Sequence, residues 1–427
     1  MTSSRDTYVF VQLPDSFESV VAGHYRVEET HAGRLGRFVY GRSYLDRADA
    51  LPLDPVHLPL SDREFETARM GGMFGVLRDT APDAWGRMIL ERRDRNRTWT
   101  ELDYLLGASS MRVGALSYGT TAAAAAAATS ESTPYRIEDL MRLQVAAAAL
   151  EGEMEGEGNQ LGQDLDAILN ASSGLGGARP KTVVADEHGQ SWIAKFPSRG
   201  DRRVNAITEA AYLRLARLCG IRTPETQVIP VDGHPTLLVR RFDKEVEPDG
   251  VRRSLYLSAH TLLGLDEDVV ARRGWSYLDL AHLLRRVSEV PALDVLELYR
   301  RMVFNSLVTN LDDHPRNHAV IATPSGTWRL SPAFDLVASN NSSLEDRRLA
   351  MACGELEGRQ RWANRDNLVS GARHFGLLAE DANAIIDEIK VKVVGEWDAC
   401  IRFYGGTDQD CQNVAHAIAY EGFEYQG

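Results

Sequence analysis

The sequence predicts an α+β fold of two lobes, the first β-rich and the second all-helical, with a small α/β subdomain in front of them. Three observations support this prediction. Strand-like and helical segments alternate in residues 1–119, strand-like segments with one strongly amphipathic helix follow in residues 135–265, and apolar residues recur at helical spacing in residues 266–427. A chain of 427 residues is also too long for one ordinary hydrophobic core.

The composition is that of a globular protein, with 44% hydrophobic and 26% charged residues. No basic region followed by an apolar run opens the chain, and no stretch reaches the roughly 18 apolar residues of a membrane span, so a cytoplasmic protein is predicted. The formal net charge of −13 disfavours direct binding to DNA phosphates but allows an indirect association through a basic partner. The four scattered cysteines form no CxxC pair, which disfavours a zinc or redox motif.

The small subdomain is predicted to end at residue 119. Strand-like composition marks YVFVQLP (8–14), RLGRFVYG (34–41) and MRVGALSYG (111–119). A helical pattern begins near Pro82 and Asp83 in the segment PDAWGRMILERRD. The low-complexity segment TTAAAAAAATSESTP (120–134) is predicted to be a surface linker.

A short polar segment, NLDDHPRN (310–317), follows an apolar helical pattern. Asp312 and Asn317 stand in the D-x-x-x-x-N spacing that protein kinases use in their catalytic loop. There the Asp orients the attacking hydroxyl, and the Asn offers a carbonyl oxygen to Mg²⁺, which prefers hard oxygen ligands. Asp335 follows Phe334 after the strand-like TWRL, in the place of the kinase DFG aspartate, although Leu336 replaces the glycine.

Upstream residues complete the kinase order. Lys195 lies in the strand-like SWIAKFPS, where a lysine would neutralise ATP phosphates, and Glu209 lies on the helix expected to pair with it. SSGLGGARPKT (172–182) is a Gly-rich turn, which permits close backbone approach to phosphate. Its glycines and cations are Gly174, Gly176, Gly177, Arg179 and Lys181.

Each of these elements has an ordinary structural alternative. The Asp-rich segment and the glycines could be plain turns, Lys195 could extend along a strand edge, and Glu209 could be an exposed helix residue. His314 and His318 invite a metal interpretation, but no further His or Cys stands at ligand spacing. The joint order of Gly-rich loop, Lys, Glu, D-x-x-x-x-N and Asp favours a kinase.

With these residues, the sequence resembles the HipA family of bacterial serine/threonine-protein kinases over nearly its whole length. The motifs that carry the resemblance are GGARPKT, WIAKFPS, LVRRFDK, MVFNSLVTNLDDHPRNHAV and LSPAFDLVAS, with PDAWGRMIL and RVGALSYG near the N-terminus. The resemblance implies that Asp312 is the catalytic base and that Asn317 and Asp335 hold Mg²⁺. It implies an ATP site formed by Gly174, Gly176, Gly177, Ala178, Arg179, Lys181, Lys195, Glu209, Arg240, Arg241, Phe242, Ser258, His314, Asn317 and Asp335.

The same resemblance implies a toxin of a two-gene toxin–antitoxin module. Its partner would be a HipB-like helix-turn-helix antitoxin that binds operator DNA, so DNA would be contacted only indirectly. The implied substrate is a serine of an aminoacyl-tRNA synthetase, with glutamyl-tRNA synthetase the first candidate, and its phosphorylation would inhibit translation and favour persistence. Family members can autophosphorylate a serine in the Gly-rich loop; Gly174 stands at that position, so Ser172 and Ser173 are the candidates.

Two other functions remain open on the sequence. A small-molecule kinase could use the same loop chemistry on a related two-lobed fold, although the long N-terminal subdomain argues against it. The chain could instead act mainly as a corepressor that binds a basic antitoxin, which its acidic surface would permit.

Overall fold

The computed structural model describes residues 4–14, 16–31, 33–122, 135–151, 168, 172, 174–198, 205–268, 271–339, 347–358 and 360–424. The chain divides into two compact units. The first comprises Met1–Arg199, Pro230–Leu257 and Ile321–Thr327, and the second comprises Gly200–Ile229, Ser258–Val320 and Trp328–Gly427. The chain therefore alternates between the units, and the predicted domain boundaries at residues 119, 134 and 265 stay a prediction. Most of the predicted linker, residues 123–134, lies outside the described residues.

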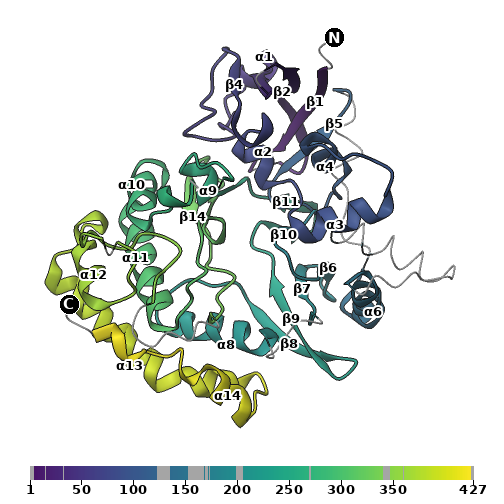
Figure 1. The fold of residues 1–427 in the computed structure, drawn as a ribbon. Coiled ribbons are helices and arrows are strands. Elements are labelled where there is room, and N and C mark those ends of the chain that lie inside the picture. The colour runs from purple at the N-terminus through teal and green to yellow at the C-terminus, as the bar shows by residue number, and fades with distance from the viewer. Residues whose placement is uncertain are drawn as a thin grey trace. The chain divides into compact units, whose positions relative to one another are not determined.

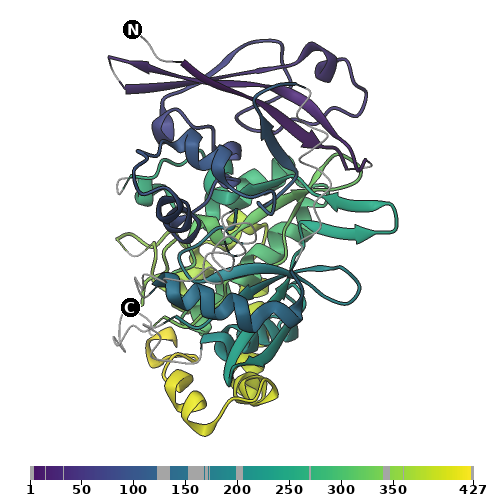
Figure 2. The ribbon, with the colours of Figure 1, turned by 90° about the vertical axis from the view of Figure 1, so that its right-hand side faces the viewer.

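A five-stranded sheet opens the first unit, with the strand order β4-β3-β2-β1-β5. Its strands are β1 (Ser4–Gln12), β2 (Ser19–Thr30), β3 (Gly33–Tyr40), β4 (Phe65–Thr67) and β5 (Leu116–Gly119). The long strands β1, β2 and β3 pair antiparallel and lie side by side (Figures 1 and 2). Along β3, buried Phe38 and Tyr40 alternate with more exposed residues, because successive side chains of a strand point to opposite faces. The strands predicted around residues 8–14, 34–41 and 111–119 are thereby confirmed.

Short helices accompany this sheet within residues 42–107. They are α1 (Arg42–Leu45), η1 (Arg69–Gly71), α2 (Gly75–Asp79), α3 (Ala84–Arg93) and α4 (Glu101–Gly107). Helix α3 confirms the helical pattern that follows Pro82 and Asp83. Helix α4 begins with a capping box, in which Thr100 and Asp103 satisfy each other's backbone N–H groups. These elements place residues 78–112 next to the Gly-rich turn of the same unit.

A second sheet has the order β6-β7-β9-β8 and carries the predicted phosphate-binding residues. Its strands are β6 (Lys181–Ala185), β7 (Ser191–Lys195), β8 (Thr226–Val231) and β9 (His234–Arg240). Nearby elements of the chain are η2 (Ile137–Asp139), α6 (Leu140–Glu151) and the hairpin β10 (Lys244–Glu247) with β11 (Gly250–Arg253). Val183, Val184, Ala194 and Leu238 are fully buried, so the sheet is part of the core of its unit.

The second unit is mainly helical. Its helices are α8 (Asn205–Leu218), α9 (Ala259–Leu262), η3 (Ala271–Gly274), α10 (Tyr277–Val287), α11 (Pro291–Leu307), η4 (Pro315–Asn317), α12 (Arg365–Ser370), η5 (Ala372–Phe375), α13 (Ala379–Phe403), α14 (Asp408–Ala415) and η6 (Glu421–Glu424). Helix α13 packs against α8 and α11. A small sheet of β12 (Tyr256–Ser258), β13 (Ala319–Ala322) and β14 (Trp328–Leu330) interrupts the helices, so the strand predicted at TWRL is confirmed and the C-terminal part is not purely helical.

The structure describes the cysteines and the apolar helices of the chain. The four cysteines, Cys219, Cys353, Cys400 and Cys411, are buried free thiols. Among the described residues, no helix has both the length and the apolar character needed to cross a bilayer.

Candidate active site

The predicted catalytic loop begins where α11 ends. Thr309, two residues after the helix, has a φ of 56°, a left-handed conformation that is rare for a β-branched residue. Its hydroxyl donates to the carbonyl of Ala417 and accepts from Arg347, which holds the residue in place. Asn310 then binds Asn305 through its backbone N–H (2.9 Å) and its side-chain amide (3.1 Å). Strained backbone of this kind costs about 1–3 kcal/mol and concentrates at functional sites.

Asp313 anchors this loop from inside the protein. The buried carboxylate accepts hydrogen bonds from Asn305 Nδ2 (2.7 Å), His318 Nε2 (2.6 Å) and the Tyr277 hydroxyl. Burial raises the pKa of the Asp313 carboxyl, but the charge of His318 and the hydrogen bonds from His318 and Tyr277 outweigh it, so this pKa lies below its usual value. The sequence prediction missed this cluster, although the Asp313 and His318 pair at a spacing of five residues was visible within the motif.

Asp312 and Asn317 meet at the other side of the same loop. The Asp312 carbonyl accepts from the backbone N–H of His314 (2.8 Å) and from Asn317 Nδ2 (3.4 Å). The turn η4 closes with a bond from Asn317 N–H to the His314 carbonyl (2.8 Å). The Asp312 side chain is exposed while that of Asn317 is mostly buried, so the predicted base faces solvent and the predicted metal ligand is held by the loop.

Residues 331–339 carry Asp335 and are tied to this loop at both ends. Ser331 N–H donates to the Ala319 carbonyl (2.8 Å), and Ser339 N–H donates to the Thr309 carbonyl (2.9 Å). The Ser339 hydroxyl also accepts from Leu311 N–H (2.9 Å). Asp335 itself has a φ of 59°, so its carboxylate is presented from a left-handed backbone, as strained functional residues often are.

The donors in these two segments fit a magnesium ion. Asn317 turns its amide nitrogen towards the Asp312 carbonyl, which leaves the amide oxygen at the opposite end of the group. That oxygen and the Asp335 carboxylate are the hard ligands that Mg²⁺ prefers. Over the described part of the chain, no three His, Cys, Asp or Glu side chains gather in an arrangement that would hold a metal ion.

Two further predicted ATP-site residues lie in the second unit near this loop. His314 packs its ring edge-on against Trp275, with ring centroids 6.1 Å apart. Ser258 is buried and caps α9, where its hydroxyl accepts from Thr261 N–H (3.1 Å). The next residue, Ala259, donates its N–H to the His318 carbonyl (2.7 Å), which joins the start of α9 to the catalytic loop.

In the first unit, β6 and β7 bring the two predicted lysines together. Lys181 and Lys195 are register partners on these antiparallel strands, so they stand directly opposite each other on one face. Like charges in that arrangement repel, and an anionic group beside them would relieve the repulsion. Lys181 also donates from Nζ to the Gly176 carbonyl (2.6 Å), which ties it to the Gly-rich loop.

The Gly-rich loop requires its glycines. Gly177 has a φ of 88°, and a Cβ at this position would lie 2.4 Å from Lys181 Nζ. A Cβ at Gly174 would lie 2.7 Å from the backbone nitrogen of Arg112. Gly176, Gly177, Ala178 and Arg179 are exposed, as a loop that receives a ligand must be.

Burial differs among the side chains of three neighbouring predicted residues, Arg240, Arg241 and Phe242. Arg240 is the register partner of Trp192 on β7, and both Arg240 and Phe242 are half-buried. The guanidinium of Arg241 is buried instead, where it donates to the carbonyls of Met111 (2.7 Å) and Arg112 (3.0 Å) and pairs with Asp243. The side chain of Arg241 therefore holds the 108–115 segment, which connects α4 to β5.

Three predicted residues remain, namely Glu209, Ser172 and Ser173. Glu209 lies buried on α8 in the second unit, and its pairing with Lys195 stays a prediction. Ser172 is fully buried, and its hydroxyl has no hydrogen-bond partner in the described structure. Ser173 lies outside the described residues, so the site of autophosphorylation stays a prediction.

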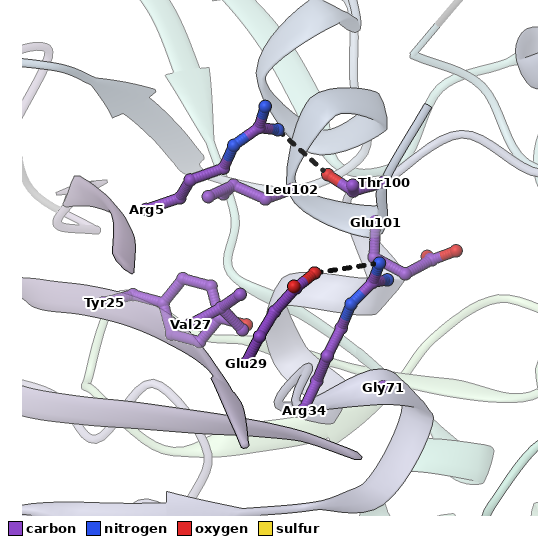
Figure 3. A pocket seen from close by; sticks show the side chains of 9 residues that line it. All are labelled: Arg5, Tyr25, Val27, Glu29, Arg34, Gly71, Thr100, Glu101 and Leu102. Atoms are coloured by element: carbon purple, nitrogen blue, oxygen red, sulfur yellow. Dashed lines mark hydrogen bonds and ion pairs between the residues drawn. The ribbon is translucent and has the colours of Figure 1, made fainter. Parts of the chain in front are cut away.

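A separate pocket lies in the first unit between the N-terminal sheet and the start of α4 (Figure 3). Its lining includes Arg5, Glu29, Arg34 and Thr100. Arg5 Nη1 lies 3.4 Å from the Thr100 hydroxyl oxygen, and Arg34 Nη2 lies 3.5 Å from Glu29 Oε1. Its volume of about 130 Å³ is below the roughly 300–1,000 Å³ of ordinary ligand pockets. It contains none of the predicted site residues, so it does not change the location of the candidate active site.

Two known proteins are similar to part of this chain. Kinase Y4mE of Sinorhizobium fredii is 31% identical over 150 residues, which are 34% of this chain and 34% of that protein. The serine/threonine-protein kinase toxin HipA of Shewanella oneidensis is 27% identical over 161 residues, which are 34% of this chain and 37% of that protein. The chain thus matches about a third of the length of these curated relatives.

A solved structure extends the likeness to nearly the whole fold. The Shewanella oneidensis MR-1 HipA, determined with HipB and operator DNA, matches with a TM-score of 0.65 at 17% identity, covering 96% of this chain and 94% of that one. Residues 18–119 match the HipA N-terminal domain, and residues 173–397 match the HipA-like C-terminal domain. Because the C-terminal match alone covers more than half of the 427 residues, this chain belongs to the HipA family.

Proposed function

We propose that this protein is an ATP- and Mg²⁺-dependent serine/threonine-protein kinase. The observation that carries the proposal is the attachment of residues 331–339 to the catalytic loop through Ser339, Thr309 and Leu311. This attachment holds Asp312, Asn317 and Asp335 in one compact unit, which is the set that a kinase needs for its nucleophile and its metal. The opposed Lys181 and Lys195 support the same proposal, because they favour an anionic ligand.

In this proposal, the exposed Asp312 carboxylate accepts a hydrogen bond from the substrate serine hydroxyl and orients it for attack. Asn317 and Asp335 would hold Mg²⁺, which neutralises charge on the phosphates when it is bound. The proposed part of Lys195, at the end of β7, is to neutralise charge on the ATP phosphates. Catalysis would then rest mainly on positioning and charge neutralisation, as is usual for phosphoryl transfer.

The proposed biological role is that of a toxin with a protein substrate. The Shewanella structure holds HipA with HipB and its operator DNA, and we propose a HipB-like antitoxin as the partner of this chain. The net charge of −13 suits a basic partner and disfavours unaided DNA binding. The proposed substrate is a serine of an aminoacyl-tRNA synthetase, glutamyl-tRNA synthetase first, whose phosphorylation would inhibit translation in the cytoplasm.

The test is phosphate transfer from γ-labelled ATP to purified synthetases, supplied one at a time with Mg²⁺. Asp312→Asn should lower turnover by about 100-fold or more while ATP still binds, because a positioned base contributes about that factor. Asp249→Asn is the matched control, since Asp249 is an exposed residue of the turn between β10 and β11.

Asp335→Ala should weaken binding of Mg²⁺–ATP as well as turnover, because it removes a metal ligand. Turnover near wild type in Asp312→Asn would show that the base is another residue. If no synthetase and no residue of the chain itself became labelled, the kinase proposal would give way to a small-molecule acceptor or to a corepressor role beside the antitoxin.

A further inference from the structure

The N-cap residue of α3 directs its side-chain hydrogen bonds outside the helix. Asp83 stands at the N-cap, where an aspartate normally accepts a hydrogen bond from a backbone N–H of the first helical turn. Here the carboxylate makes no such cap bond. Instead, Oδ2 accepts from the backbone N–H of Gly177 (2.9 Å), and Oδ1 accepts from Arg78 Nη2 (2.9 Å). The residue therefore serves the Gly-rich loop, 94 positions away in the sequence.

Trp85 adds two more bonds to the same loop. Its backbone N–H donates to the Gly177 carbonyl (3.2 Å), and its indole Nε1–H donates to the Lys181 carbonyl (3.1 Å). Together, Asp83 and Trp85 bind both the N–H and the carbonyl of Gly177. Trp85 is only 2% exposed, so it is packed inside its unit and is not a surface group.

The packing around the loop agrees with this attachment. A Cβ at Gly176 would lie 3.1 Å from Asp83 Oδ2, so the carboxylate lies close to this part of the loop as well. At Gly174, a Cβ would lie 2.7 Å from the backbone nitrogen of Arg112 and 3.0 Å from the Ser109 carbonyl oxygen, so the backbone passes close to that segment. Both ends of the predicted phosphate-binding loop thus rest on the N-terminal domain.

The negative charge of Asp83 argues against an incidental contact between this residue and the Gly-rich loop. A carboxylate beside a phosphate-binding loop would repel the phosphates, and it binds a backbone N–H of the kind that such loops offer to phosphate. Arg78 offsets part of this charge, because its nearly buried guanidinium lies against the other carboxylate oxygen. The arrangement is understandable if the position of Gly177 matters more than one additional N–H for the ligand.

We propose that the N-terminal domain sets the position of the Gly-rich loop, with Asp83 as the positioning residue and Trp85 as its support. This inference rests on the proposed function, because it assigns the loop to nucleotide binding. Loss of the hydrogen bond from Gly177 to Asp83 releases Gly177 and weakens nucleotide binding, while turnover at saturating ATP stays close to that of the wild type. The N-terminal domain then has a direct part in the kinase site.

The first test needs no nucleotide. Hydrogen–deuterium exchange of the full chain is followed in peptides that cover residues 174–180, for Asp83→Ala, Asp83→Asn and the control Asp94→Ala. Asp94 is exposed at the other end of α3 and carries the same charge. Exchange at Gly177 should rise about 10-fold in Asp83→Ala, since a hydrogen bond to a charged group is lost. It should rise less in Asp83→Asn, whose amide oxygen can still accept the bond, and unchanged exchange in Asp83→Ala would overturn the proposal.

The second test measures KM for ATP and kcat separately in the same variants, with direct titration of Mg²⁺–ADP as the binding probe. KM and the Kd of Mg²⁺–ADP should be about 10-fold higher in Asp83→Ala than in Asp83→Asn, because both variants remove the charge but only the asparagine can still accept the bond from Gly177, and kcat should stay within about twofold of the wild type. A fall in kcat at unchanged KM would contradict a positioning role. If Asp83→Ala fails to fold, Trp85→Phe keeps the buried ring, removes the indole N–H, and should show a smaller change in the same direction.

Failure of the proposed function would look different. A wild-type chain that binds no Mg²⁺–ADP would remove the nucleotide-binding role of the loop, and the proposal would fall with it even if exchange at Gly177 depended on Asp83. If the wild type binds the nucleotide and Asp83→Ala binds it as tightly as Asp83→Asn does, the positioning role is overturned and the kinase proposal stays intact.

Discussion

Asp312 and Asp313 are adjacent carboxylates with opposite environments. Asp312 is exposed and belongs to the proposed chemistry, whereas Asp313 is buried and bound by Asn305, His318 and Tyr277. Adjacent residues of an irregular loop can point to opposite sides, and the donors around Asp313 make its ionised form favourable inside the protein. The two residues therefore predict different consequences of the same substitution.

Asp313→Asn should lower the free energy of unfolding by about 3 kcal/mol, because one partner of a buried, hydrogen-bonded charge pair is removed. Urea denaturation of wild type and variant measures the difference, and the exposed Asp249→Asn serves as the control. An unchanged urea midpoint would show that the cluster does not stabilise the loop.

Asp103 gives a pH dependence in the N-terminal domain. Burial raises the pKa of its carboxyl, but hydrogen bonds from Thr100, Arg97 and Arg5 outweigh burial and lower this pKa from 3.8 to about 2. Because the folded-state pKa is depressed, its stabilising contribution is present above about pH 4 and is lost as the pH falls towards 2. The size of that contribution is about 2 kcal/mol at neutral pH.

Asp103→Asn should therefore be less stable than the wild type at pH 6, and the two should converge between pH 4 and pH 2. Thermal unfolding at a series of pH values would measure this difference. A constant difference in stability over the whole range would show that the Asp103 charge is not responsible.

At the scale of the elements, the long helix α13 contains a glycine at a position with room for a side chain. Gly395 is exposed within this helix, and a Cβ there would meet no atom within 4 Å. Gly354 is the opposite case, because a Cβ would lie 2.1 Å from the Asn367 carbonyl oxygen next to α12. The element around a glycine, and not the residue type, decides what its replacement does.

Gly395→Ala should stabilise the protein by about 0.5–1 kcal/mol, since alanine loses less conformational entropy in a helix. Gly354→Ala should destabilise it by about 2 kcal/mol or more, because the backbone would have to move. Thermal melting of both variants beside the wild type compares the two directions, and stabilisation by Gly354→Ala would contradict the close approach seen here.

At the scale of the whole molecule, the N-terminal domain and the strands after it share one compact unit. Arg241 binds the carbonyls of Met111 and Arg112, and the Asp243 carboxylate accepts from Gly114 N–H (2.8 Å). Burial lowers the pKa of the Lys244 ammonium well below its usual value. These groups tolerate burial because the 108–115 segment supplies hydrogen bonds to them.

A chain shortened to residues 135–427 should fail to fold stably, because Arg241, Asp243 and Lys244 would lose these partners. Circular dichroism and thermal melting of the shortened and full chains would test this. A cooperative transition of the shortened chain at the temperature of the full one would show that the C-terminal part is independent.

Much of the candidate site could be predicted from the sequence because the relevant features are local. The D-x-x-x-x-N spacing of Asp312 and Asn317, the glycines of the 174–177 turn and the amphipathic pattern of α8 depend on residues close together in the chain. Such patterns set helix faces, turn conformations and the order of motifs. They sufficed for the fold class and for membership of the family.

The tertiary structure alone decided which groups meet across long separations. It placed Lys181 opposite Lys195, buried the Arg241 guanidinium against the 108–115 segment, and joined Asp83 to Gly177. It also buried the side chain of Asp313 and left that of its neighbour Asp312 exposed. The physical reason is that strand register, burial and long-range hydrogen bonds depend on how the whole chain packs, and no local propensity encodes that packing.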